Sequence, residues 1–153
     1  MRHLDRAKIP YKVLTYDIPM EEFSGEAVSD LLGLPYEACY KTLGVTHGPD
    51  VYLCVIPVSG ELDLKKAAKT LGVKSLEMIH VKDLLKTVGY ERGSVTPIAA
   101  RKNRGVLFDA EVLKHERIEI SGGEFGIGLT VNRDDLLRFL GAKTAEITRR
   151  NHE

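Results

Sequence analysis

Residues Val51–Val58 have the sequence VYLCVIPV, a nearly continuous apolar run that is short and rich in β-branched side chains. Such a run is typical of a strand that is buried on both faces of its sheet. The stretch Tyr40–Val45 precedes it, and residues 47–50 between the two have the turn-forming sequence HGPD. We therefore predict a β-hairpin, with Tyr40–Val45 as the partner of the buried strand Val51–Val58.

Helices and further strands are predicted on both sides of this hairpin. The clearest helix begins at Asp63 and ends at Gly72, because its apolar residues recur at spacings of three and four while its lysines face away. We also expect strands at Tyr11–Tyr16, Leu76–Ile79, Gly105–Asp109, Arg117–Ile120 and Ile127–Val131, short helices at 24–32, 81–88 and between Asn132 and Gly141, one helical turn at 109–113 and a loop at 93–100. These strands alternate with the four short helices too irregularly for a doubly wound sheet, so we predict an α+β (mixed α/β) fold.

Length and composition are those of an ordinary globular domain. The 153 residues, 43% hydrophobic and 29% charged, suffice for one core, and no repeat or linker divides them, so we predict a single domain over residues 1–153. The 22 Lys and Arg balance the 22 Asp and Glu, which excludes a nucleic-acid binder that relies on bulk positive charge but not a local basic patch. No apolar stretch is long enough to cross a bilayer and we see no secretion signal, so we expect a cytoplasmic protein without membrane contact.

The usual catalytic and metal-binding motifs are missing from the sequence. It contains no GxSxG, P-loop, HExxH or GxGxxG pattern. Cys39 and Cys54 lack the spacing of a metal site or a disulfide framework and are predicted to be buried thiols. The five histidines pair with no cysteine or carboxylate at a suggestive spacing, so we expect them on the surface (His3, His47, His80, His115, His152). We expect neither a metal nor a cofactor.

Three segments place polar or small residues where chemistry can occur. Alternation puts Lys41 on the face of Val45, and the lysine is then either a surface residue at a strand edge or a desolvated ammonium that steers an anion or a polarised carbonyl. The loop Gly93–Ile98 (GSVTPI) is either a connecting turn or a cradle of backbone N–H groups for an oxyanion. The segment Ser121–Gly126 (SGGEFG) is either a hairpin turn or a close approach to a ligand.

Basic side chains gather in three places along the chain. These are the predicted helix after Asp63 (Lys65, Lys66, Lys69), the stretch after the loop Gly93–Ile98 (Arg101, Lys102, Arg104) and the last residues (Arg149, Arg150). A charge run is ordinarily a solvated face. The middle group directly follows a candidate active loop, so it is also a candidate guide for a phosphate-bearing substrate.

Several short motifs occur in one order and spacing. They are YKTL from Tyr40, LDLKKAAK from Leu62, GY from Gly89, TP at Thr96, ISGG from Ile120 and GAK from Gly141. Together they resemble the YbaK/EbsC group of aminoacyl-tRNA deacylases, relatives of the editing domain of bacterial prolyl-tRNA synthetases, over about residues 9–150. The resemblance implies a mixed α/β fold with a curved, partly barrel-like sheet and short flanking helices. It also implies hydrolytic removal of a mischarged amino acid from tRNA, in trans to the synthetase.

The same resemblance assigns roles to individual residues. Lys41 matches the essential lysine that orients the 3′-terminal adenosine and the ester. The loop at Thr96 and Pro97 matches a Ser-Pro loop whose backbone faces the aminoacyl carbonyl, so these two residues join Lys41 as implied catalytic residues. The implied substrate-binding residues are Tyr16, Phe23, Thr42, Gly93, Ile98, Ser121, Gly122 and Gly123.

The chain departs from the family pattern around the amino-acid pocket. Ser94 and Ala99 stand where the family usually has glycine, and the region Gly126–Gly128 lacks the acidic residue that commonly follows the SGG loop. These departures bear on which amino acid is removed more than on the reaction. Cysteine on tRNA(Pro) is the expected substrate, as in the YbaK branch, and alanine or another small amino acid is the alternative.

The residue inventory is consistent with a protein that supplies no nucleophile. The substrate's own thiol, its 2′-OH or a positioned water attacks the ester, while the protein contributes placement and stabilises the oxyanion. Attack by the thiol of a cysteinyl ester would make the reaction lyase-like. The expected partners are the acceptor end of aminoacyl-tRNA and, as in the YbaK branch, prolyl-tRNA synthetase. A different class of function stays open, in which a non-catalytic module binds the tRNA 3′ end.

Overall fold

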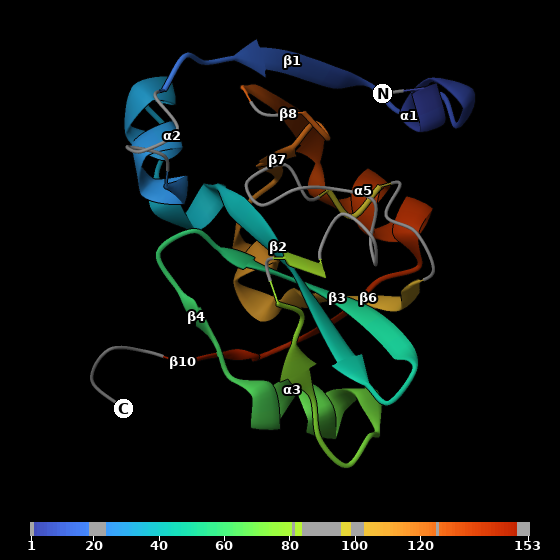
Figure 1. The fold of residues 1–153 in the computed structure, drawn as a ribbon. Helices are drawn as coiled ribbons and strands as arrows, with labels where there is room; N and C mark the ends of the chain where they lie inside the picture. Colours follow the sequence, from blue (N-terminus) through green and yellow to red (C-terminus); the bar gives the residue numbers. More distant parts are fainter. Residues whose placement is uncertain are drawn as a thin grey trace.

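Figure 1 shows the computed structural model of the chain, which describes residues 2–18, 24–80, 82–83, 96–98, 103–124 and 126–149. The strands are β1 (Tyr11–Thr15), β2 (Tyr40–His47), β3 (Asp50–Pro57), β4 (Glu61–Leu62), β5 (Glu77–Met78), β6 (Asn103–Asp109), β7 (Arg117–Ser121), β8 (Ile127–Asn132), β9 (Lys143–Ala145) and β10 (Thr148–Arg149). The helices are α1 (Arg2–Arg6), α2 (Gly25–Leu32), α3 (Leu64–Leu71) and α5 (Arg133–Leu140), with the 3-10 helices η2 (Tyr36–Ala38) and η3 (Ala110–Lys114). The predicted strands are confirmed, with ends shifted by one or two residues.

The strands form three sheets. The largest has the order β5-β2-β3-β6-β9, a second has the order β1-β8-β7, and β10 pairs with β4. The predicted hairpin is confirmed, because β2 and β3 are antiparallel with Lys41 opposite Ile56 and Val45 opposite Tyr52. By contrast, β6 runs parallel to both β3 and β9. This mixture of parallel and antiparallel pairs confirms the predicted mixed α/β class, and the described strands do not close into a barrel.

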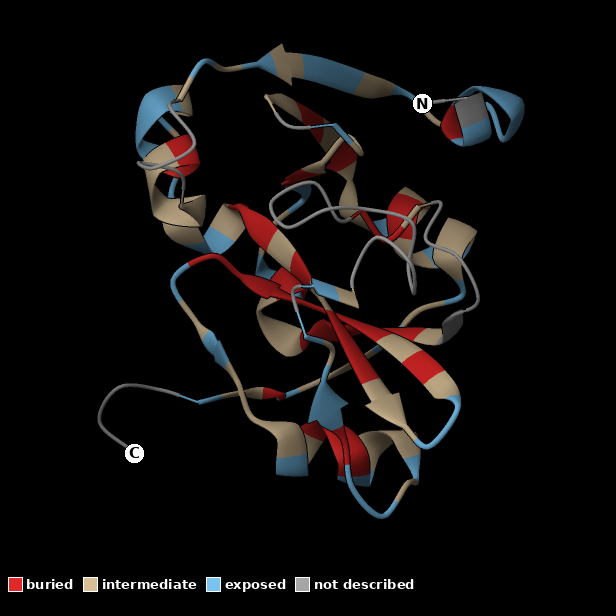
Figure 2. Ribbon diagram, in the orientation of Figure 1, coloured by how far each residue is buried: buried red, intermediate tan, exposed pale blue. Residues whose placement is uncertain are grey.

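The central strand β3 separates two apolar clusters (Figure 2). Leu53 and Val55 belong to the first cluster, which lies between the large sheet and the strands β7 and β8. Cys54 and Ile56 belong to the second cluster, which α3 covers with Ala67. Because successive side chains of a strand point to opposite faces, an unbroken apolar run is what a strand between two cores requires. The prediction that Val51–Val58 is buried on both faces is therefore confirmed.

The helices predicted at 24–32, from Asp63 to Gly72 and between Asn132 and Gly141 are confirmed, and each is capped at both ends. The Ser24 Oγ accepts a hydrogen bond from the backbone N–H of Ala27 at 3.0 Å. The Asp63 Oδ1 accepts from two N–H groups of the first turn of α3, each at 3.1 Å. The Asn132 Oδ1 accepts from Asp135 N–H at 3.0 Å. Each of these helices ends at a glycine with a left-handed φ, between 60° and 74° (Gly33, Gly72, Gly141).

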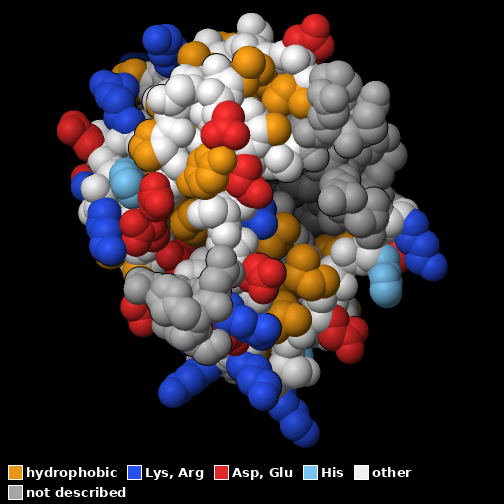
Figure 3. Space-filling view, turned by 90° about the vertical axis from the view of Figure 1, so that its left-hand side faces the viewer, with side chains coloured by type: hydrophobic (Ala, Val, Ile, Leu, Met, Phe, Trp, Pro, Cys, Tyr) orange, Lys and Arg blue, Asp and Glu red, His pale blue; other side chains and the backbone are white. Residues whose placement is uncertain are grey.

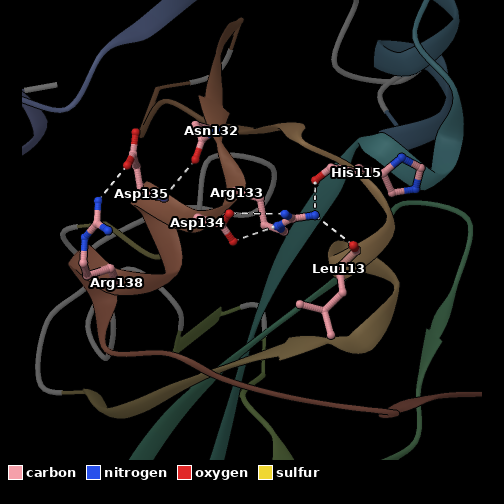
Figure 4. Close-up of polar contacts among 7 residues, drawn as sticks. All are labelled: Leu113, His115, Asn132, Arg133, Asp134, Asp135 and Arg138. Atoms are coloured by element: carbon pink, nitrogen blue, oxygen red, sulfur yellow. Dashed lines mark hydrogen bonds and ion pairs between the residues drawn. The ribbon is translucent and has the colours of Figure 1, made fainter.

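The start of α5 is tied to η3 by one arginine (Figure 4). Arg133 Nη1 donates to the carbonyl oxygens of Leu113 and His115, at 2.8 and 3.2 Å, while its other nitrogens pair with Asp134. The prediction that His115 is a solvated histidine without a carboxylate neighbour is wrong. Its ring is half-buried and its Nε2 lies 3.6 Å from the Glu111 Oε1, because His115 caps the short helix η3 whose first turn contains Glu111.

Some short elements escaped prediction, and some predictions lie outside the described residues. The strands β4, β9 and β10 and the helix α1 have two to five residues each. The C-terminal segment is held by Asp109, whose Oδ1 accepts from Ile147 N–H at 3.0 Å and from Thr148 Oγ1 at 3.1 Å. Most of the helix predicted at 81–88 and most of the predicted loop at 93–100 lie outside the described residues, and the described residues 82 and 83 are helical. Within the described part, no helix is long and apolar enough to span a membrane.

Candidate functional site on the β2 and β7 face

An isolated β-bridge joins the large sheet to the sheet of β1, β8 and β7. Cys39, the residue before β2, pairs in parallel with Glu119 of β7. Paired residues point to the same side of a sheet, and alternate residues along each strand share that side. Lys41 and Ser121, each two residues further along, therefore lie on the same face as Glu119. Two of the predicted site residues thus share one face near the junction of β2 and β7, which lies in the upper half of Figure 1.

Lys41 is paired on one side only by the described ladders. It lies opposite Ile56 of β3, whereas β5 pairs with β2 only at Val45 and Thr46. The predicted face is confirmed, because Lys41 pairs with Ile56, which belongs to the second apolar cluster together with Val45. The side chain is half-buried. The arrangement gives a lysine whose stem lies over apolar surface while its ammonium remains accessible to a ligand.

Tyr16 extends the same face across β8 to the end of β1. Its backbone N–H donates to the carbonyl oxygen of Gly126 at 2.9 Å, which continues the pairing of β1 with β8. In that register Leu14, Gly128 and Ser121 form one cross-strand row, and Tyr16 lies on their side. Burial raises the pKa of the Tyr16 phenol, and the nearby Glu119 adds to the rise. The predicted pocket residues Tyr16 and Ser121 therefore lie on one face with Lys41.

The segment after Ser121 forms a hairpin turn between β7 and β8. Gly122 N–H donates to Ile127 O at 2.9 Å, and Gly123 N–H donates to Ser121 Oγ at 3.1 Å. A Cβ atom on Gly122 would lie 2.7 Å from Ile127 Cγ2, so the hairpin itself requires a glycine there. The hairpin interpretation of the SGG segment is confirmed, and its predicted contact with substrate stays a prediction.

Of the remaining predicted site residues, some are described by their burial and contacts, and the others lie outside the described residues. Thr42 is buried, with 8% of its surface exposed, and its position on β2 directs it to the face opposite Lys41. Thr96 and Pro97 are also buried. Ile98 donates its N–H to Thr96 Oγ1 at 3.4 Å and packs against the first apolar cluster. Phe23 and Gly93, and the basic residues 101 and 102, lie outside the described residues.

Glu119 is the member of this face that the sequence analysis missed. It is 6% exposed, and burial raises the pKa of its carboxyl from 4.5 to about 8. A Cβ atom on Gly128 would overlap the Glu119 Oε1 and lie 3.1 Å from its Cδ, so the carboxyl group fills the space above Gly128. The sequence lacks an acidic residue at 126–128, and the neighbouring strand β7 supplies one at that place. Glu119 alternates with the buried Ile118 and Ile120 and pairs with Thr130, so the sequence pattern of β7 gives no signal that its side chain is buried.

The two cysteines are buried thiols, as predicted. Burial raises the pKa of Cys39 to about 11 and that of Cys54 to about 12. Thiolates are the reactive form of cysteine, so both side chains are unreactive thiols near neutral pH. Among the described residues, no group of three or more His, Cys, Asp or Glu side chains is arranged to hold a metal ion.

The surface on the side of α2 and β4 is hollowed and unevenly charged (Figure 3). Basic side chains gather at the bottom of this view, where Figure 1 places α3. Lys65 and Lys69 are exposed there, as predicted. The prediction that Lys66 also faces away is wrong, because its Nζ donates to Thr148 O at 3.4 Å and the side chain is half-buried. Its stem lies against β10, which brings the C-terminal segment across the helix.

Comparisons with known proteins now identify the class. Residues 21–139 match the aminoacyl-tRNA editing domain, and the chain belongs to that family. A relative from Enterococcus faecalis, named "Putative Cys-tRNA(Pro)/Cys-tRNA(Cys) deacylase EbsC", is 36% identical over 151 residues, which cover 97% of this chain and 91% of the relative.

Solved structures show the same fold at low sequence identity. Hypothetical protein APE2540 superposes with a TM-score of 0.87 over 97% of both chains, at 22% identity. A protein described as a putative trans-editing enzyme for prolyl tRNA synthetase has a TM-score of 0.80 and 20% identity, covering 92% of this chain and 87% of the other. These structures confirm that the mixed sheet is the fold of the editing domain.

Proposed function

We propose that the protein is a trans-editing deacylase that removes a mischarged amino acid, cysteine in the first place, from tRNA(Pro). The single observation that carries this proposal is the position of Lys41. The half-buried lysine lies opposite Ile56 on the side of the second apolar cluster and shares its face with Ser121 and Tyr16, within a chain of the aminoacyl-tRNA editing family. A cation held on such a face can bind the terminal nucleotide and stabilise negative charge on an ester carbonyl.

The proposed reaction is hydrolysis of the ester between the amino acid and the terminal ribose of tRNA. A nucleophile adds to the ester carbonyl, the C–O bond to the ribose breaks, and the ribose oxygen takes a proton. Lys41 stabilises the oxyanion, and the backbone around Thr96 and Pro97 is proposed to face the carbonyl. The described cysteines are buried thiols, so the attacking atom is proposed to be a water, or the substrate thiol with a water opening the resulting thiolactone. Attack by the 2′-OH moves the acyl group along the ribose, and a water must still release it.

Cysteine is favoured as the amino acid because the relative from Enterococcus faecalis carries that substrate in its name and is similar over nearly the whole chain. Prolyl-tRNA synthetase is the proposed partner, in the cytoplasm where tRNA is charged, and the chain is proposed to act as one domain over residues 1–153. Alanine or another small amino acid is the second candidate, because Ser94 and Ala99 replace glycines next to the proposed carbonyl-binding loop.

Deacylation of tRNA(Pro) charged with cysteine, alanine or proline tests the proposal. We expect purified protein to release cysteine fastest and to leave proline attached. Faster release of alanine would support the deacylation reaction but show that alanine, and not cysteine, is the preferred amino acid. If none of the three amino acids is released while the charged tRNA still binds, the proposed deacylase activity is wrong. A non-catalytic module that binds the tRNA 3′ end would then be favoured.

A further inference from the structure

Glu119 is a buried carboxyl group for which the described residues show no side-chain partner. Only 6% of its surface is exposed, and the described residues give its side chain neither a hydrogen bond nor an ion pair. Burying a carboxylate without a cation or donors is costly, so proteins rarely retain one without a use. Glu116, which precedes the same strand, shows the ordinary alternative because it is exposed to solvent.

The surroundings of Glu119 define what it can bind. It pairs with Cys39 across the junction of the two sheets, its carboxyl group lies above Gly128, and its charge acts on Tyr16. Lys41 lies two residues along β2 from that pair, which is about 7 Å of strand. Tyr16, Lys41 and Ser121 are each partly exposed, so a ligand can reach this face from solvent.

An aminoacyl ester has two neighbouring groups that bind partners of opposite charge. Its carbonyl oxygen, which gains negative charge during hydrolysis, is two bonds from the carbon that carries the α-ammonium group. A lysine and a glutamate on neighbouring strands of one face match this pair of charges. We propose that Glu119 binds the α-ammonium group of the aminoacyl ester while Lys41 lies at the carbonyl. This inference rests on the deacylase function proposed above.

The protonation states of Glu119 and of the groups around it are consistent with this pairing. In the free protein the groups that face the carboxyl are the Tyr16 phenol and the Cys39 thiol, both with raised pKa values, and burial keeps the carboxyl largely protonated near neutral pH. Lys12 lies on the same face but is exposed. A bound amine and Glu119 share one proton, which the pair holds as carboxylate and ammonium. No covalent step is involved.

The pairing has a consequence for substrate choice. Peptidyl-tRNA carries an amide in place of the α-ammonium group, and an amide cannot supply the charge that Glu119 needs. Such a substrate would leave the buried carboxyl unpaired, so it is discriminated against by a site built for a free amine. Glu119 therefore makes the editing site selective for unacylated amino acids, which spares growing chains.

The test combines a change in the protein with a change in the substrate. Wild type, Glu119→Gln and the control Glu116→Gln are assayed on the best-cleaved aminoacyl-tRNA and on the same tRNA after N-acetylation. We expect acetylation to lower kcat/KM of the wild type and of the control on the order of 10–100-fold. For Glu119→Gln, we expect kcat/KM on the substrate with the free amine to be lower than that of the wild type by a similar factor. Acetylation of the substrate should change kcat/KM of this variant by less than about threefold. A Glu119→Gln variant that discriminates as strongly as the wild type would overturn the inference.

A binding measurement separates this inference from the deacylase proposal. A 3′-aminoacylamino-adenosine has an amide in place of the labile ester, so calorimetry can compare its free and N-acetylated forms without turnover. The wild type could cleave no aminoacyl-tRNA and still bind the free amine more tightly than the acetylated form. If Glu119→Gln then abolishes this difference, the role of Glu119 is supported and the proposed deacylase activity is rejected. Equal affinity of the wild type for both forms, or binding of neither, overturns the role of Glu119.

Discussion

The carboxyl group of Glu119 occupies the space that a side chain at Gly128 would fill. The two residues are on adjacent strands, β7 and β8, and a Cβ atom on Gly128 would overlap the Glu119 Oε1. The glycine therefore permits the acid to lie flat across the sheet, where it remains 6% exposed. The burial of Glu119 requires a glycine at position 128, and the close approach of Glu119 explains why that position has no side chain. Measurements of stability can test this relationship directly.

Gly128→Ala is expected to destabilise the protein by about 1–3 kcal/mol, because the new methyl group must displace a buried carboxyl group. Urea unfolding measures the change. Gly105→Ala is the matched control, since a Cβ atom there meets only Tyr52 Cδ1, at 3.9 Å. Combining Gly128→Ala with Glu119→Ala should recover part of the lost stability, because the second change removes the clash. Equal costs for Gly128→Ala with and without Glu119 would contradict the proposed packing.

Stability should fall as pH rises, through Glu119. Burial raises its pKa from 4.5 to about 8, so in that interval the folded protein holds a proton that the unfolded chain has released. The free energy of unfolding therefore declines between about pH 4.5 and pH 8, by at most about 5 kcal/mol from this group, and its contribution is constant above that range. Tyr16 and Cys39 beside it have raised pKa values and stay neutral through the interval.

The comparison with Glu119→Gln isolates this contribution from other titrations. We expect the variant to gain stability over the wild type as the pH is raised from 5 to 9, because the amide cannot ionise. Urea unfolding at several pH values gives the difference directly. Parallel curves for the two proteins would show that Glu119 ionises in the folded state as it does in the unfolded chain.

Much of the fold could be predicted from the sequence because its signals are local. The apolar run Val51–Val58, the caps Ser24 and Asp63, and the glycine at the end of each helix act within a few residues of themselves. By contrast, β4 and β10 consist of two residues each and pair over 86 positions, as Leu62 opposite Thr148. Strands of two residues are too short to show the alternation of apolar and polar residues that identifies a strand. Their pairing is determined only by the folded structure around them.

The candidate site divides in the same way. Lys41 could be predicted because a cation interrupts an apolar strand, and the register of β2 confirms its face. Glu119 could not, because alternation within β7 places it outward with Arg117, on the face that a strand pattern assigns to solvent. Its burial depends on the bridge to Cys39, 80 positions earlier, and on the missing side chain of Gly128.

The cysteines should be chemically silent in the folded protein. Burial raises the pKa of Cys39 to about 11 and of Cys54 to about 12, so almost no thiolate exists at pH 7.5. We expect iodoacetamide to label neither residue in the native protein and both in urea, as mass spectrometry can measure. Cys39→Ala should retain deacylase activity within about threefold. Loss of activity in a folded Cys39→Ala protein would mean that this thiol takes part in the reaction.

Lys41 is expected to separate activity from stability. Its stem covers apolar residues of the second cluster, whereas its ammonium is assigned to the substrate, so Lys41→Met preserves the packing and removes only the charge. We expect kcat/KM for Cys-tRNA(Pro) to fall at least about 100-fold, with the free energy of unfolding within about 1 kcal/mol of wild type. Lys74→Met, at an exposed lysine that follows α3, is the matched control and should retain activity. A Lys41→Met protein with wild-type turnover would remove the observation on which the proposed function rests, whereas a loss of activity that merely follows a loss of folding would make Lys41 structural.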